Sequence, residues 1–193
     1  EILVNSWRKS FCGNGDEKSE FIKIATARAG NVIGGGDWAE NRLIPDFFRA
    51  NKSNKTLNIR SPNSIRPWQH VLEPLSGYLL LCEKMVETSD NFSESWNFGP
   101  DQLGEKTVLW VVNQLIKLVP NTRWKFIKNQ KKFKEANLLK LDITKAKSKL
   151  GWKPRWSIEK ALDMTVKWYQ MSNENVDTMY EYSLEQIKSY QLG

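Results

Sequence analysis

Apolar and polar positions along the chain recur with two spacings, one typical of strands and one typical of helices. Short segments in which apolar residues alternate with polar ones, or form a continuous run, predict strands. These segments are 21–29, 57–60, 65–71, 96–98 and 124–128. We expect the first of them to be a buried strand, because it ends in a nearly unbroken apolar run.

Longer segments carry apolar residues every three or four positions, which predicts helices. We expect them at 1–11, from about 42 around Pro45, at 74–87 with an apolar face of Leu75, Tyr78, Leu79, Cys82 and Val86, from Thr107 to about 119, at 142–150 and at 158–171. Thr107 and Ser157 are expected N-caps, and Gly151 is expected to end its helix. Strands alternate with helices, so the predicted fold class is α/β.

The size and composition of the chain exclude several classes of protein. With 193 residues it can form one sizeable core but not two ordinary domains. No run approaches the roughly 20 apolar residues of a membrane span, and the first residues do not resemble a signal peptide. The two cysteines cannot form a disulfide framework. We therefore expect a cytoplasmic protein with no membrane partner.

Positive charge is concentrated in one region. The net charge is +7, but residues 121–160 alone hold 13 Lys and Arg against 3 Asp and Glu. This excess allows three interpretations: a solvated basic face, a surface for nucleic acid, or a field that attracts a small anionic ligand.

Two segments carry residues suited to ligand binding. A glycine-rich segment, 30–37, follows the first predicted strand, at the end where open α/β sheets bind ligands. It is neither a P-loop nor the Gly-x-Gly-x-x-Gly fingerprint that opens a helix, so a ligand loop and a simple turn are both open. In the second segment, Arg66 can donate two hydrogen bonds to a phosphate. His70 is the single histidine, so we expect it to be structural and we expect no metal site.

These segments carry a resemblance to a known family. Residues 27–38, 42–45, 59–62 and 66–75, with Trp-Asn-Phe-Gly at 96–99 and Gly-Trp-Lys-Pro at 151–154, resemble the C-terminal half of the CDP-glucose 4,6-dehydratases. These enzymes are nucleotide-sugar dehydratases of the extended short-chain dehydrogenase/reductase family. The resemblance extends over about residues 1–170, and Gly-Gly-Gly-Asp-Trp and Arg-Pro-Trp-Gln-His favour the CDP-sugar branch over the dTDP-sugar branch.

The resemblance implies a fold and a reaction. The fold would hold the last strands of the NAD-binding Rossmann domain, about 1–30, interleaved with a mixed α/β substrate-binding domain, about 31–193, as one unit. The reaction would convert CDP-glucose to CDP-4-keto-6-deoxyglucose with catalytic NAD: hydride leaves C4, water is lost across C5 and C6, and hydride returns to C6. This places the family in deoxysugar biosynthesis, including that of the lipopolysaccharide O-antigen.

The family's catalytic machinery has no counterpart here. None of the five tyrosines has a lysine four positions later, so the Tyr-x-x-x-Lys pair of the family is missing, as is its glycine fingerprint. We therefore expect no catalytic residue in this chain, and NAD bound mainly by an N-terminal part that the chain lacks. The expected partners are CDP-glucose, the missing half or a companion chain, and further copies in a homo-oligomer. Alone, the chain is expected to be inactive.

The resemblance assigns binding roles to seven residues. Arg66 would clamp the diphosphate, and Asn31 and Asn97 would lie beside it. Residues 42 and 43 would flank the nucleotide, Ile59 would face the base and Glu135 would contact the ribose hydroxyls. The substrate-binding residues are thus Asn31, Arg42, Leu43, Ile59, Arg66, Asn97 and Glu135. Each has a structural alternative: turn formation for the asparagines, core packing for Leu43 and Ile59, and a partner of the basic region for Glu135.

Two tryptophans, Trp38 and Trp68, fall in these segments and are expected to line a pocket, whereas Trp110, Trp124, Trp152, Trp156 and Trp168 are expected in the core. Two other functions stay open: another nucleotide-sugar epimerase or dehydratase of the same family, and a nucleic-acid-binding domain that uses residues 121–160. The resemblance itself implies no nucleic-acid partner.

Overall fold

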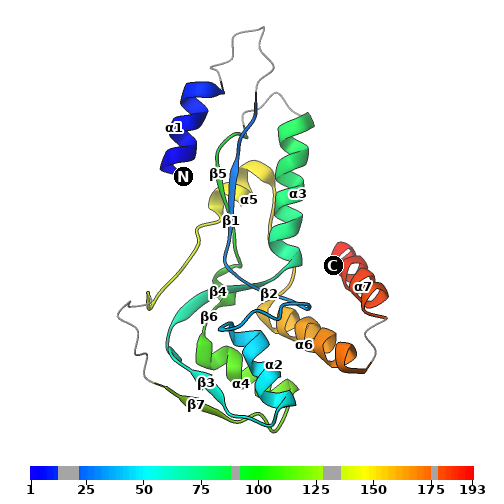
Figure 1. The fold of residues 1–193 in the computed structure, drawn as a ribbon. Helices are drawn as coiled ribbons and strands as arrows, with labels where there is room; N and C mark the ends of the chain where they lie inside the picture. Colours follow the sequence, from blue (N-terminus) through cyan, green and yellow to red (C-terminus); the bar gives the residue numbers. More distant parts are fainter. Residues whose placement is uncertain (13–21, 88–91, 128–135, 175–177) are drawn as a thin grey trace.

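The computed structural model describes residues 1–12, 22–87, 92–127, 136–174 and 178–193. The chain folds into two stacked parts, with a parallel strand pair in the upper part of Figure 1 and two small sheets in the lower part. After the first strand of this pair, residues 26–29, the chain crosses into the lower part. It later returns to the upper part, where residues 95–98 form the second strand of the pair. Segments far apart in sequence therefore build each part.

The upper part is built on β1 (Thr26–Ala29) and β5 (Ser95–Phe98), which pair in parallel. Helices α3 (Leu72–Glu87) and α5 (Thr144–Leu150) pack against this pair. The smaller of two hydrophobic cores lies between them: Leu81, Phe92, Trp96, Phe98, Ile143, Ala146, Leu150 and Trp152. Helix α1 (Ile2–Phe11) lies beside the pair and buries no residue.

The lower part contains two short sheets. In one, β4 (Ile65–His70) lies between β2 (Asn31–Ile33), which is parallel to it, and β6 (Glu105–Thr107), which is antiparallel. In the other, β3 (Leu57–Ile59) pairs in parallel with β7 (Trp124–Phe126). Helices α2 (Leu43–Lys52), α4 (Val108–Leu118) and α6 (Ile158–Glu174) and the 3-10 turn η1 (Gln102–Gly104) complete this part.

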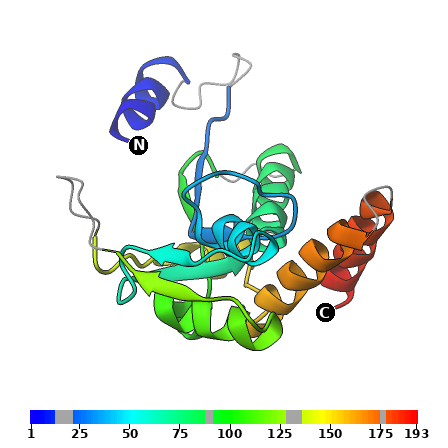
Figure 2. The same cartoon turned by 60° about the horizontal axis from the view of Figure 1, so that its bottom comes forward.

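The larger hydrophobic core holds the lower part together. It contains Ile33, Ile44, Phe47, Phe48, Ala50, Leu57, Ile59, Trp68, Val111, Val112, Leu115, Ile158, Ala161, Leu162, Val166 and Tyr169. Phe48 stacks on Tyr169 with ring centroids 4.0 Å apart, which joins α2 to α6. The turned view in Figure 2 shows α2 and α4 beside the sheets and α6 leading away toward the C-terminus.

A buried carboxylate fixes the last helix, α7 (Met179–Leu192), to the rest of the chain. Glu73 is fully buried at the start of α3. It accepts hydrogen bonds from the backbone N–H groups of Arg155 and Trp156 and, at 2.7 Å, from the hydroxyl of Tyr190 on α7. Burial raises the pKa of Glu73, and these hydrogen bonds act in the opposite direction. The carboxylate therefore links α3, the segment before α6, and α7.

The expected helix ends are confirmed by local hydrogen bonds. The Thr107 hydroxyl accepts from the N–H of Trp110 at 3.1 Å, and the Ser157 hydroxyl accepts from the N–H of Lys160 at 3.2 Å. Gly151 ends α5 in the left-handed conformation, with φ of 69°. These caps use only neighbouring residues, which is why the sequence predicts them.

Several expectations are wrong in part. The strand expected at 21–29 is confined to β1, because only Thr26–Ala29 finds a partner strand. The glycine-rich segment is not loop throughout, since Asn31–Ile33 pairs with β4. Helix α3 begins at Leu72 rather than residue 74, and α6 extends to Glu174. Strand β6 and helix α7 were not expected, because neither has a strong apolar period.

The predicted apolar face of α3 also lies differently. Leu75, Leu79, Cys82 and Val86 are exposed, and Gly77 and Leu81 face the core instead. Gly77 is needed there, because a Cβ atom on it would lie 2.2 Å from Cδ1 of Phe98. Close packing of a glycine, which carries no hydrophobic signal, decides the orientation of this helix.

Four lysines of the basic region form ion pairs with three acidic residues from elsewhere in the chain. On α5, Lys145 and Lys149 pair with Glu94, and Lys147 pairs with Asp101. Lys140 pairs with Glu105 at 2.5 Å. These ion pairs favour the interpretation of a solvated face over that of a nucleic-acid surface.

Candidate functional site

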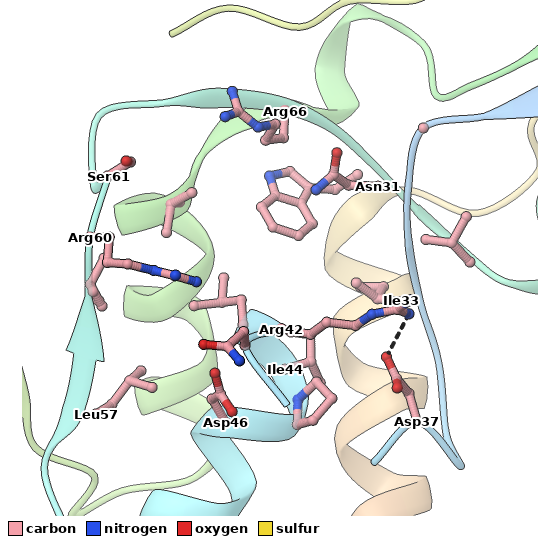
Figure 3. A pocket seen from close by; sticks show the side chains of 18 of the residues that line it. Asn31, Ile33, Asp37, Arg42, Ile44, Asp46, Leu57, Arg60, Ser61 and Arg66 are labelled. Atoms are coloured by element: carbon pink, nitrogen blue, oxygen red, sulfur yellow. Dashed lines mark hydrogen bonds and ion pairs between the residues drawn. The ribbon is translucent and has the colours of Figure 1, made fainter. Parts of the chain in front are cut away.

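A cavity of about 560 Å³ opens between β2, the start of α2, β3 and β4 in the lower part of the molecule. Five of the seven residues expected to bind substrate line it: Asn31, Arg42, Leu43, Ile59 and Arg66. They come from four different elements or their flanks, so it is the tertiary fold that brings them together. Figure 3 shows Asn31 and Arg66 at one end of the cavity and Asp46 and Leu57 toward the other.

Parallel pairing of β2 with β4 places Asn31 and Arg66 at the same end. Asn31 is in register with Trp68, two residues after Arg66. The Trp68 indole is buried, lines the cavity and donates from Nε1 to the carbonyl oxygen of Lys106 at 3.0 Å. Because the ring is fixed from both sides, it forms a rigid wall between the asparagine and the arginine. The expectation that Trp68 lines a pocket is met.

The glycine-rich segment after β2 is held in a defined shape. A Cβ atom on Gly35 would lie 2.0 Å from Cγ of Trp168, so only glycine fits under that ring. Gly36 has φ of 78°, which a glycine adopts without strain. The hydroxyl of Tyr169 donates to the carbonyl oxygen of Asp37, and burial raises the pKa of Tyr169 to about 12, so this donor keeps its proton. The glycines thus serve close packing.

Asp37 in turn orients Arg42 at the mouth of the cavity. Its Oδ1 accepts from the N–H of Ala39 at 3.0 Å, and its Oδ2 pairs with Nη1 of Arg42 at 3.2 Å, as the dashed line in Figure 3 marks. A second aspartate on the cavity wall, Asp46, is paired with Arg49. Both carboxylates therefore already have a cationic partner.

The charges on the cavity wall favour an anion. Three arginines, Arg42, Arg60 and Arg66, line the cavity against the two paired aspartates. Guanidinium groups bind phosphate oxygens through two parallel hydrogen bonds. A site with this excess of arginine is suited to a diphosphate.

Apolar side chains form the other half of the wall. Ile44, Leu57 and Ile59 line the cavity and belong to the larger core, and Val108 packs against that core. Such a surface accommodates one face of a flat ring, such as a nucleic-acid base. The cavity therefore combines cationic and apolar side chains, as a site for a nucleoside diphosphate requires.

Of the expected binding residues that the structure describes, Asn97 does not join this group. Asn97 lies on β5, where its Oδ1 accepts from Nε of Arg28 and its Nδ2 donates to the carbonyl oxygen of Asp142, both at 3.0 Å. Glu135 lies outside the described residues. Trp38, expected to line a pocket, is 51% exposed and packs on the edge of Tyr169 instead.

His70 is structural, as expected. It is buried beside Trp156, its Nδ1 accepts from the N–H of Leu72 at 3.3 Å, and burial lowers its pKa to about 4. It does not line the cavity. Across the described segments, no cluster of three or more His, Cys, Asp or Glu side chains is arranged to hold a metal ion.

The structure adds residues that we did not expect on the wall. Arg60, Asp46, Asn41, Asn58 and Ser61 all line the cavity. Arg60 directly follows Ile59, so its position beside the predicted base site was a signal in the sequence. Asp46 lies one turn after Arg42 on α2, where helical spacing places both near one face.

Comparison with known proteins shows what the chain is similar to. Over 170 residues, the chain is 43% identical to the CDP-glucose 4,6-dehydratase of Salmonella typhimurium strain LT2, a match that covers 88% of this chain and 47% of that protein. The chain is similar to the C-terminal part of CDP-glucose 4,6-dehydratase. The resemblance inferred from the motifs is thus confirmed. No model of a protein family matches the chain.

Solved structures confirm the fold. The dTDP-glucose 4,6-dehydratase of Bacillus anthracis, in complex with NAD, has a TM-score of 0.69 at 20% identity, covering 90% of this chain and 50% of that one. The UDP-glucuronic acid 4-epimerase of Bacillus cereus, in complex with UDP-glucuronic acid and NAD, has a TM-score of 0.71 at 19% identity, covering 88% and 49%. The fold is that of part of an extended short-chain dehydrogenase/reductase.

The chain spans about half the length of the curated relative and of these two structures. Among the described helices, none has the length and apolar character needed to cross a membrane.

Proposed function

We propose that this chain supplies the nucleotide-sugar-binding part of a CDP-glucose 4,6-dehydratase. The observation that carries the proposal is the convergence of Asn31 and Arg66 at one end of a cavity whose wall also carries the apolar side chains of Ile44, Leu57 and Ile59. The 43% identity to the Salmonella enzyme supports CDP-glucose as the nucleotide sugar. Such a protein would act in the cytoplasm, in deoxysugar biosynthesis that includes the O-antigen.

In this proposal the cationic end of the cavity binds the diphosphate. Arg66 donates to the phosphate oxygens, and the amide of Asn31 donates to a phosphate or sugar oxygen. Arg42 and Leu43 flank the nucleotide from the start of α2, and Ile59 contacts the base. Asn97 keeps its predicted role only if substrate reaches beyond the cavity, since both of its side-chain polar atoms are already hydrogen bonded. Glu135 is proposed to contact the ribose hydroxyls, as the resemblance implies.

The glycine-rich segment that the structure describes is not a dinucleotide-binding loop for the phosphates of NAD. The glycine-rich segment after β2 does not open a helix, and Trp168 fills the space over Gly35. We therefore propose that NAD and the Tyr-x-x-x-Lys pair come from a part that this chain lacks, on the same or a companion polypeptide, and that the complete enzyme is a homo-oligomer. When bound, NAD would accept a hydride from C4 of the sugar and return it to C6.

Titration of CDP-glucose into the chain tests the proposal, with binding followed by calorimetry. Binding is expected, together with no loss of water from the sugar when NAD is added to this chain alone. The variant R66Q is expected to weaken binding by about 10-fold or more, since a charge-assisted pair contributes about 1.5–3 kcal/mol. Lys125 is exposed on β7 outside the cavity, so K125Q is the matched control. Failure of the folded chain to bind CDP-glucose would overturn the proposal.

A second candidate is a nucleotide-sugar epimerase of the same fold, favoured by the TM-score of 0.71 to the UDP-glucuronic acid 4-epimerase. Product analysis of the complete enzyme separates the two reactions, because a dehydratase product has lost one water and an epimerase product has the mass of its substrate.

A further inference from the structure

The end of the cavity opposite Arg66 is shared with a second cavity of about 510 Å³. Residues on the wall between the two are Asn41, Asp46, Leu57, Asn58 and Arg60. A nucleotide whose diphosphate lies at Arg66 would therefore bring the far edge of its base to this wall. The inference below concerns that edge, and it rests on the proposed function.

Arg60 follows the last residue of β3 and extends into the cavity (Figure 3). No hydrogen bond or ion pair joins its side chain to another described residue. A guanidinium carries N–H donors in a fixed fork and accepts nothing. Arg60 therefore presents donors to whatever occupies this end of the cavity.

Asp46 provides acceptors next to it. One carboxylate oxygen, Oδ1, pairs with Nη2 of Arg49, and the same guanidinium donates to the carbonyl oxygens of Trp38 at 2.8 Å and Ala39 at 3.0 Å. These contacts hold Asp46 in place. Within the described part of the chain, no hydrogen bond occupies Oδ2, and Figure 3 shows the carboxylate in the same half of the cavity as Arg60.

A protein wall that presents two hydrogen-bond donors followed by an acceptor can distinguish cytosine from uracil and thymine. Cytosine presents two adjacent acceptors, O2 and N3, followed by its N4 amino donor, which carboxylates accept from. Uracil and thymine present a donor at N3 between two acceptors. A guanidinium with a neighbouring carboxylate matches the edge of cytosine. With uracil or thymine, the N3 donor would face the N–H groups of the guanidinium and the O4 acceptor would face the carboxylate, and both contacts are unfavourable.

We propose that Arg60 and Asp46 read the edge of cytosine and make the site specific for cytidine nucleotides. Arg60 donates to O2 and N3, and Asp46 accepts from the N4 amino group. The apolar side chains of Leu57 and Ile44, which line the same cavity, contact the face of the ring. The specificity for the nucleotide thus lies at the opposite end from the residues that bind its diphosphate.

The test compares CDP with UDP as probes, measured by calorimetry on the wild-type chain and on R60M. Wild type is expected to prefer CDP. In R60M the affinity for CDP falls by about 5- to 150-fold, the range of one two-hydrogen-bond contact to a base, while the affinity for UDP is expected not to fall, because the N–H groups that face its N3 donor are gone. K55M removes the same charge from the wall of the second cavity alone, so it is expected to preserve the CDP preference.

A second variant tests the acceptor. D46N replaces a group that only accepts with one that also donates, so it is expected to improve UDP binding relative to CDP. Equal loss of CDP and UDP affinity in R60M would assign Arg60 to the phosphates and overturn the inference, as would a wild-type chain that binds both nucleotides equally. A folded wild-type chain that binds neither nucleotide would overturn the proposed function itself, which is a different result.

Discussion

His70 shows how burial sets the behaviour of a single titratable side chain. The neutral imidazole accepts from the N–H of Leu72, while its Nε2 is buried with no hydrogen-bond partner among the described residues. Adding a proton would bury a charge, and for this reason the pKa falls from its ordinary 6.5 to about 4.

We predict that this side chain makes the fold sensitive to mild acid. Below pH 6.5 the unfolded chain protonates His70 and the folded chain does not, so the free energy of unfolding falls as pH decreases, by about 3 kcal/mol in total down to pH 4. The measurement is urea denaturation at several pH values for wild type and H70Q. The difference between their slopes should be confined to this window, and parallel profiles would contradict the prediction.

Gly35 is the second residue whose surroundings decide its identity, because Trp168 occupies the place of a side chain. We predict that G35A destabilises the fold by about 1–3 kcal/mol through overpacking. Chemical denaturation measures this change. In a W168L background the same substitution should be much less harmful, since the smaller side chain leaves room for a methyl group. An unchanged penalty in that background would show that backbone strain, rather than the ring, is responsible.

At the scale of elements, helix α3 shows that an apolar side chain is not always a buried one. Leu81 is 4% exposed and Leu79 is 72% exposed, although the two are equally apolar. We predict that L81A lowers the free energy of unfolding by about 2–5 kcal/mol, by leaving a cavity in the smaller core. L79A, the matched control, should change it by no more than about 0.5 kcal/mol. Denaturation curves of both variants measure the difference, and equal losses would mean that the exposed face is covered in solution.

The same helix shows why some features could be predicted from sequence and others could not. Helix caps at Thr107, Ser157 and Gly151 depend on neighbours in sequence, and the sequence predicts all three. Which face of α3 is buried depends on the fit of Gly77 against Phe98, a contact between distant segments. Local rules carry no information about such a fit.

For the molecule as a whole, the sequence predicted some of the residues that line the cavity and missed others. Asn31, Arg66 and Ile59 were placed by motif, and the cavity brings them together. Arg60 and Asp46 were missed, because their significance comes from a wall that exists only when β3 and α2 lie side by side. Sequence motifs thus point to several residues of one cavity, and the tertiary structure adds the two residues that we propose select the base.

The two terminal helices differ in how they are joined to this whole. Helix α1 buries no residue, and the Arg8 side chain, which donates from Nε to the carbonyl oxygen of Ile24 at 2.9 Å, is one of its few links. Helix α7 buries Met179, Gln186 and Tyr190, and through Tyr190 it reaches the buried Glu73.

We therefore predict opposite effects of two truncations. Removal of residues 1–11 should change the free energy of unfolding by less than about 1 kcal/mol, because a helix with no buried side chain contributes little to the global stability. Removal of residues 178–193 should lower it by at least about 3 kcal/mol, since it exposes apolar surface and leaves the Glu73 carboxylate with one hydrogen bond fewer. Urea denaturation of both forms measures the changes. A loss on removing α1 as large as that on removing α7 would show that α1 is packed against the rest of the chain.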